Sequence, residues 1–75
     1  MANIVIAALY KFAKLPDYRE MQNGLFDFCV AQGLNGTILL AAEGINGTVA
    51  GTRTGIDALI NFLGADARLA GIEHK

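Results

Sequence analysis

The densest group of residues able to do chemistry is the run Glu43-Gly44-Ile45-Asn46-Gly47. On a rigid hairpin, the carboxylate of Glu43 and the amide of Asn46 would be placed to bind a polar ligand. Glycine and asparagine also accept positive φ angles, so the same run is typical of a tight reversal whose side chains bond only nearby backbone. The spacing alone favours this structural interpretation over a ligand site.

A second group combines basic and aromatic side chains. Lys11, Lys14 and Arg53 are expected at one edge of a sheet, with Tyr10 and Phe12 near them. Such surfaces can stack bases and contact phosphate, which makes RNA a candidate ligand. Three basic residues in a chain with a small excess of acidic residues are more often part of an ordinary solvent-exposed surface. The chain also has no basic stripe that would neutralise several phosphates.

Cys29 and His74 are the single cysteine and the single histidine. Cys29 falls late in a predicted helix on its apolar stripe, away from the helix N-terminus or cations that lower a thiol pKa. His74 has no second histidine or cysteine with which to share a metal. We therefore expect a core cysteine, a solvated strand histidine, and no catalytic residue, metal or cofactor in this chain.

The composition indicates one globular domain over residues 1–75. The chain is 53% hydrophobic and 17% charged, with a formal net charge of −1. Its apolar stretch at residues 4–9 is too short to span a membrane and lacks the basic segment of a signal peptide. One cysteine excludes an internal disulfide and fits a reducing compartment. We expect a cytoplasmic protein without a membrane partner.

Periodicity and turn residues predict the elements that must position these side chains. Residues 3–13 are apolar on both alternating faces and predict a strand with neighbours on each side. A helix follows, with Asp17 and Glu20 as a capping box at its start and Gly33 as its stop. Its apolar stripe consists of Met21, Leu25, Phe28 and Cys29.

Two further strands are predicted to form a hairpin. Asn35-Gly36 is expected to turn the chain into a strand at residues 37–43. Residues 44–47 predict a tight reversal, and residues 48–52 predict the returning strand. Two short apolar runs separated by a glycine and asparagine cluster indicate antiparallel pairing.

The remaining elements complete an α+β fold. Thr54 is the expected cap of a second helix that ends at Gly64, and residues 71–75 open a fourth strand that is cut short. The order β-α-β-β-α-β predicts the ferredoxin-like plait, an antiparallel sheet with two helices on one face and the first and third strands central. The truncated last strand suggests a fragment of a longer protein. Because the first strand is apolar on both sides, the open face is expected to pack against another domain or subunit.

Three segments stand in the order and spacing of a known family. With them, the chain resembles the N-terminal domain of the rhodanese-related tRNA uridine hydroxylases, also described as rhodanese-like sulfurtransferases. The resemblance covers essentially the whole chain and is most specific at residues 41–48. It implies an acylphosphatase-like plait followed by a rhodanese domain. The segments are Tyr10-Lys11-Phe12, Leu40-Ala41-Ala42-Glu43-Gly44-Ile45-Asn46-Gly47-Thr48 and Arg68-Leu69-Ala70-Gly71-Ile72.

The resemblance also implies a function. Full-length members hydroxylate the wobble uridine of certain tRNAs at carbon 5 with molecular oxygen, through a cysteine loop of the rhodanese domain that Cys29 does not match. We therefore expect an accessory domain of a tRNA-modifying oxidoreductase. Its expected partners are the rhodanese domain of the same protein and tRNA. By motif membership, the candidate substrate-binding residues are Tyr10, Lys11, Phe12, Glu43 and Asn46.

Two alternatives fit the same sequence. Many plaits self-associate or act as regulatory binding modules, which makes a homo-oligomer through the open face one of them. A small independent enzyme that uses Glu43 and Asn46 is the other. Acylphosphatase activity is disfavoured, because residues 11–16 contain neither the glycines nor the arginine of a phosphate-binding loop.

Overall fold

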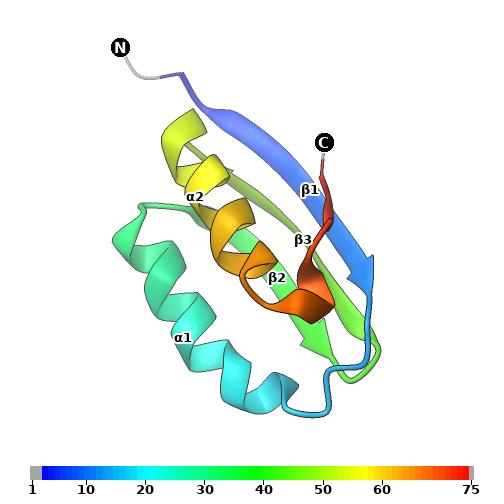
Figure 1. Cartoon of the computed structure of the whole chain (residues 1–75). Helices are drawn as coiled ribbons and strands as arrows, with labels where there is room; N and C mark the ends of the chain where they lie inside the picture. Colours follow the sequence, from blue (N-terminus) through cyan, green and yellow to red (C-terminus); the bar gives the residue numbers. More distant parts are fainter. Residues whose placement is uncertain (1–2, 75) are drawn as a thin grey trace.

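The sheet is built around its first and third strands. The structure, a computed structural model, describes residues 3–74. Strands β1 (Val5–Phe12), β2 (Asn35–Ala41), β3 (Gly44–Gly51) and β4 (Glu73–His74) stand in the order β2-β3-β1-β4 (Figure 1). Every neighbouring pair is antiparallel. The prediction that the first and third strands are central is confirmed.

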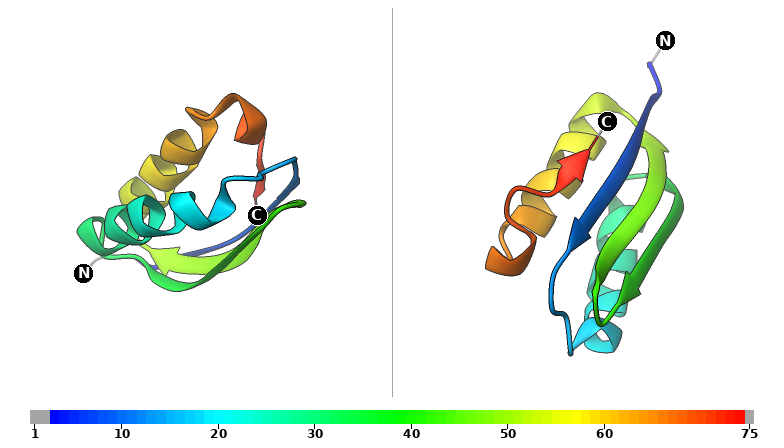
Figure 2. Two further views of the ribbon diagram at one scale, coloured as in Figure 1. Left: turned by 90° about the horizontal axis from the view of Figure 1, so that it is seen from below. Right: turned by 90° about the vertical axis from the view of Figure 1, so that its right-hand side faces the viewer.

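Two helices cover one face of this sheet (Figure 2). Helix α1 (Tyr18–Ala31) joins β1 to β2, and helix α2 (Arg53–Gly64) leads through a short 3-10 helix (Ala67–Leu69) to β4. The order is therefore the β-α-β-β-α-β of the ferredoxin-like plait, as predicted. The last strand is short, and its two residues pair with Leu9 and Tyr10 of β1.

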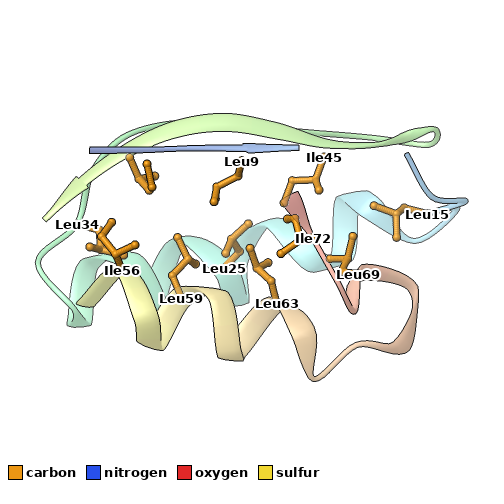
Figure 3. Packing of buried hydrophobic residues seen from close by; sticks show 12 residues of the cluster. Leu9, Leu15, Leu25, Leu34, Ile45, Ile56, Leu59, Leu63, Leu69 and Ile72 are labelled. Carbon is orange, nitrogen blue, oxygen red and sulfur yellow. The ribbon is translucent and has the colours of Figure 1, made fainter. Parts of the chain in front are cut away.

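The core is one apolar layer between the sheet and the helices (Figure 3). Ala7 and Leu9 enter it from β1, because alternate residues of a strand point to opposite faces. Leu59 of α2 meets them from the other side and is fully buried. Burying an aliphatic side chain of this size contributes about 1.5–3 kcal/mol. The buried apolar residues are Ala7, Leu9, Leu15, Leu25, Leu34, Ile45, Val49, Ile56, Leu59, Leu63, Leu69 and Ile72.

The hairpin between β2 and β3 turns at Ala42 and Glu43, so the predicted reversal at residues 44–47 is wrong. Ala41 and Gly44 form the last cross-strand pair, and residues 44–47 already belong to β3. Gly44 was predicted to form the turn, but it is the first residue of β3. Its φ of +149° lets the chain re-enter the sheet directly after the turn.

Backbone bonds from the segment after β1 hold this turn in place. The amide of Ala13 donates to the carbonyl of Glu43 at 3.0 Å, and the amide of Leu15 donates to the carbonyl of Ala42 at 2.8 Å. Both carbonyls of the turn are therefore satisfied by the strand end beside them. The hairpin tip is fastened to the end of β1 rather than left free.

The predicted caps need two corrections. Helix α2 is capped by Thr52, whose side-chain oxygen accepts from the amide of Gly55 at 3.1 Å, whereas the sequence pattern favoured Thr54. The extended backbone of Thr52 suits a cap, and Thr54 is already helical. Asp17 occupies the N-cap of α1 without a side-chain capping bond, so the predicted capping box does not form. Its carboxylate is engaged by Arg68 instead.

The end of α1 confirms one prediction and corrects another. Gly33 has φ +68°, and the amide of Leu34 donates to the carbonyl of Cys29 at 2.9 Å, which is the Schellman pattern. The predicted stop at Gly33 is therefore confirmed. Asn35-Gly36 is not a turn but the first two residues of β2, since the reversal is already complete at Gly33.

Candidate functional site on the open sheet face

The face of the sheet opposite the helices is apolar and exposed. Ile6, Tyr10 and Phe12 of β1 are 67%, 48% and 82% exposed, and Leu39 of β2 is 59% exposed. Tyr10 pairs with Asn46 across β1 and β3, and Asn46 pairs with Leu39 across β3 and β2. Directly paired residues project to the same side of a sheet. These side chains therefore form one surface, which we call the open face.

A shallow groove of about 240 Å³ lies at the hairpin end of the open face. The rings of Tyr10 and Phe12 stand edge to face along it, with centroids 6.1 Å apart and planes at 74°. Leu39 lines it from β2, and the turn contributes Glu43. We call this feature the hairpin groove. All five candidate substrate-binding residues contribute to its lining: Tyr10, Lys11, Phe12, Glu43 and Asn46.

Gly44 allows the hairpin end of β3 to lie close against the backbone of β1. It pairs with Phe12 on one side and Ala41 on the other. A Cβ at this position would lie 3.0 Å from the Cα of Phe12 and closer still to the carbonyl oxygen of Lys11. The structural interpretation of Gly44 is thus confirmed. The same expectation for Asn46 is wrong, because positive φ occurs only at glycines among residues 3–74.

The predicted basic patch does not form. Lys11 alternates with Tyr10 and Phe12, so its ammonium lies on the helix side, where it donates to the carbonyl of Ala70. Arg53 begins α2 at the opposite end of β1 and lies 3.8 Å from Asp57 in an exposed ion pair.

Lys14 is exposed after β1, between two residues whose amides bond the carbonyls of the hairpin turn, so it lies at the hairpin end of the sheet and apart from Arg53. Lys11 is the only lysine or arginine within the four described strands. The four described strands therefore bring aromatic rings but no lysine or arginine to the open face, and the single Lys14 near the turn is fewer cations than nucleic-acid phosphates need.

A carboxylate borders the aromatic pair on its other side. Glu73 of β4 is the cross-strand partner of Tyr10. It raises the pKa of the Tyr10 hydroxyl, first as a hydrogen-bond acceptor for that group and then by its negative charge. At neutral pH Tyr10 is therefore a protonated phenol, suited to donating a hydrogen bond and not to acting as a base.

Cys29 and His74 lie apart from this site. Cys29 is half-buried against the edge of the core, and burial raises the pKa of its thiol. Such a thiol is the opposite of an activated nucleophile. His74 is exposed on β4, with its Nδ1 3.3 Å from the carbonyl oxygen of Ile72, as expected of a solvated strand residue. Within residues 3–74 no three histidine, cysteine, aspartate or glutamate side chains are grouped to hold a metal.

Three residues of the open face were missing from the candidate set. Ile6 and Leu39 are signalled by the alternation of their strands, which places every second residue on one side. No local sequence pattern indicates that Glu73 belongs to the open face, because it lies beside Tyr10 through pairing between the two ends of the chain.

The fold and the site define a class of protein. The chain is a ferredoxin-like plait with an uncovered apolar sheet face and a groove at its hairpin end. A family model described as the UPF0176 acylphosphatase-like domain matches residues 4–75. The chain belongs to this family.

Curated relatives agree with this assignment. The chain is 51% identical over all 75 residues to a tRNA uridine(34) hydroxylase of Picosynechococcus sp. and covers 25% of that protein. It is 48% identical over 73 residues, 97% of the chain, to the protein of the same name from Agrobacterium fabrum, and covers 23% of it. It is also 51% identical over 75 residues to the Teredinibacter turnerae protein, again covering 23%. The chain thus spans about a quarter of the length of the relatives it matches. Among residues 3–74, no helix is long and apolar enough to cross a membrane.

Proposed function

We propose that this chain is an accessory domain of a tRNA uridine(34) hydroxylase, an oxidoreductase of tRNA processing that modifies the wobble uridine. Support comes from the family match over residues 4–75 and from three relatives that carry this name. The domain contributes no reacting group. Its one thiol is half-buried with a raised pKa, and its one histidine is solvated. The chemistry belongs to the rhodanese domain that the resemblance implies.

The observation that carries this proposal is the open face itself. Ile6, Phe12 and Leu39 are exposed on the same side of the sheet, and the described strands bring no lysine or arginine to that side. Exposed apolar surfaces of this kind usually mark contacts with another protein surface. A nucleic-acid surface would instead present cations to the phosphates.

The open face therefore docks against the rhodanese domain of the same protein. Docking would hold that domain and its bound tRNA in a fixed relative orientation and would exclude water from the joint surface. Orientation of this kind affects rate without donating a group to the reaction. Most tRNA phosphate contacts then fall to other parts of the protein, and the whole assembly works in the cytoplasm.

The test uses the full-length hydroxylase that carries this domain. Phe12→Ser and Leu39→Ser place polar groups on the open face, and Phe26→Ser serves as the control, because Phe26 is 67% exposed on α1. We expect both open-face variants to lower wobble hydroxylation several-fold, measured by mass spectrometry of tRNA nucleosides, while Phe26→Ser retains it.

Removal of residues 1–75 from the same enzyme completes the test. We expect it to reduce both hydroxylation and thermal stability of the remainder. Unchanged activity and unchanged stability would contradict an accessory role. A tight dimer of the full-length protein that Phe12→Ser dissociates would favour self-association through the open face instead.

A further inference from the structure

Two carboxylates, those of Glu43 and Glu73, lie at the hairpin groove of a family linked to tRNA. Glu43 is exposed at the turn and lines the groove, and Glu73 lies beside Tyr10 at its border. The one lysine among the lining residues, Lys11, directs its ammonium to the carbonyl of Ala70 on the helix side. A ligand at the groove therefore meets these two carboxylates, with Lys14 as an exposed cation near the turn.

Aromatic rings stand next to this charge. Phe12 is 82% exposed and meets Tyr10 edge to face, so the faces of both rings are partly free. The exposed amide of Asn46 lies between Tyr10 and Leu39 in the same row. A phenyl face attracts a cation, a carboxylate pairs with it, and an amide oxygen accepts its hydrogen bonds.

These three features match one side chain. The guanidinium of arginine is planar, stacks on aromatic rings and donates several hydrogen bonds in one plane to a carboxylate. We propose that the hairpin groove binds an arginine side chain presented by the remainder of the same full-length protein. This inference rests on the proposed docking of the open face and names the chemistry of its partner.

Charge complementarity decides between this occupant and RNA. A phosphate entering the groove would approach Glu43 and Glu73, with the single Lys14 near the turn to offset the repulsion. An arginine is attracted by both carboxylates and by the rings of Tyr10 and Phe12. Arginine is also enriched at the centres of protein interfaces, where aromatic partners surround it.

The first experiment measures hydroxyl-radical oxidation of Phe12 relative to Phe26 in the full-length protein. The charge reversal Glu43→Arg is compared with Glu20→Arg, because Glu20 is equally an exposed glutamate but lies on α1. Loss of one cation–aromatic and carboxylate contact corresponds to about a tenfold weaker docking equilibrium. We expect Glu43→Arg to increase the relative oxidation of Phe12 and Glu20→Arg to leave it unchanged. Circular dichroism shows whether each variant remains folded, and Phe26 is the exposed reference for the oxidation rate.

The second experiment finds the partner. Each arginine outside residues 1–75 is replaced by glutamine, alone and together with Glu43→Arg. We expect that replacing one of these arginines increases the oxidation of Phe12. In the Glu43→Arg background the same replacement should cause no further increase, because the effects of replacing two residues in direct contact are not additive. Replacement of that arginine by glutamate should restore the protection of Phe12 in the Glu43→Arg background.

The outcomes separate this inference from the proposed function. Phe12 could be protected in the wild type while its oxidation changes neither with Glu43→Arg nor with any arginine replacement. The proposed arginine contact is then wrong, and the docking of the open face is still supported. Protection of Phe12 that appears only after tRNA is added would make the groove an RNA site and overturn the inference. A Phe12 that is unprotected with and without tRNA would overturn the docking and the inference together.

Discussion

Arg68 engages Asp17 across 51 positions of sequence, with its Nη2 3.2 Å from Oδ2 of the aspartate. The same guanidinium donates to Asp66, whose Oδ2 lies 2.6 Å from Nη2. Asp17 precedes α1, while Asp66 and Arg68 follow α2. One side chain thus ties the start of the first helix to the end of the second, at the same end of the molecule as the hairpin groove.

Acid should weaken this connection in a defined window. Hydrogen bonds from Arg68 lower the pKa of Asp17 and lower that of Asp66 from 3.8 to about 2. A carboxyl group whose pKa is depressed by folding stabilises the fold above its unfolded pKa and loses this contribution as pH falls through its folded pKa. We expect thermal unfolding midpoints, followed by circular dichroism, to fall between about pH 4 and pH 2.

Replacing Arg68 by glutamine should lower the midpoint at neutral pH and flatten its decline in that acid window. Arg53→Gln is the matched control, because Arg53 and Asp57 are 3.8 Å apart with side chains 76% and 62% exposed. Exposed pairs of this kind contribute little. An Arg68→Gln protein with the acid profile of the wild type would show that the ion pairs do not stabilise the fold.

Gly44 should tolerate no side chain. Its φ of +149° is strained for any other residue, and a Cβ would press on the backbone of Lys11 and Phe12. We expect Gly44→Ala to lower the free energy of unfolding by about 1–3 kcal/mol or more in denaturant titrations. Gly24→Ala is the control, since Gly24 lies within α1 with open space around it. That change should stabilise by about 0.5–1 kcal/mol, and equal effects of the two would contradict this role of Gly44.

The sequence predicts the strands and helices better than it predicts the turns between them. Alternation along β1 depends on every second residue, and it places Ile6 and the buried Leu9 on opposite sides of the sheet. The hairpin corner depends on single residues. Ala42 and Glu43 form the turn although neither is a typical turn residue, and Gly44 beside them serves the close approach of two backbones. A glycine that permits a close contact and one that makes a turn look alike in a sequence.

The candidate site could also be predicted only in part. Motif membership selected five residues that do line one groove. The alternation along β1 already places Lys11 on the side opposite Tyr10 and Phe12, but the charge of that groove also depends on the pairing of Glu73 with Tyr10, which joins the two ends of the chain. The capping bond predicted for Asp17 does not form for a related reason, although Asp17 is the N-cap residue of α1. Its partner Arg68 is distant in sequence, and no local pattern records it.

Cys29 should react slowly with alkylating reagents. Burial raises the pKa of its thiol and reduces the thiolate present at neutral pH. We expect its reaction with iodoacetamide at pH 7, followed by mass spectrometry, to be slower than that of free glutathione and to accelerate as the pH is raised. Alkylation faster than that of glutathione would indicate an activated thiol and reopen a catalytic role for this domain.

The most direct test of the account is the relative oxidation of Phe12 and Phe26 by hydroxyl radicals in the full-length protein. In the domain alone both side chains are exposed, Phe12 to 82% and Phe26 to 67%. Docking of the open face predicts that Phe12 is oxidised several-fold more slowly than Phe26. Equal or faster oxidation of Phe12 would contradict the docked face and the accessory function built on it.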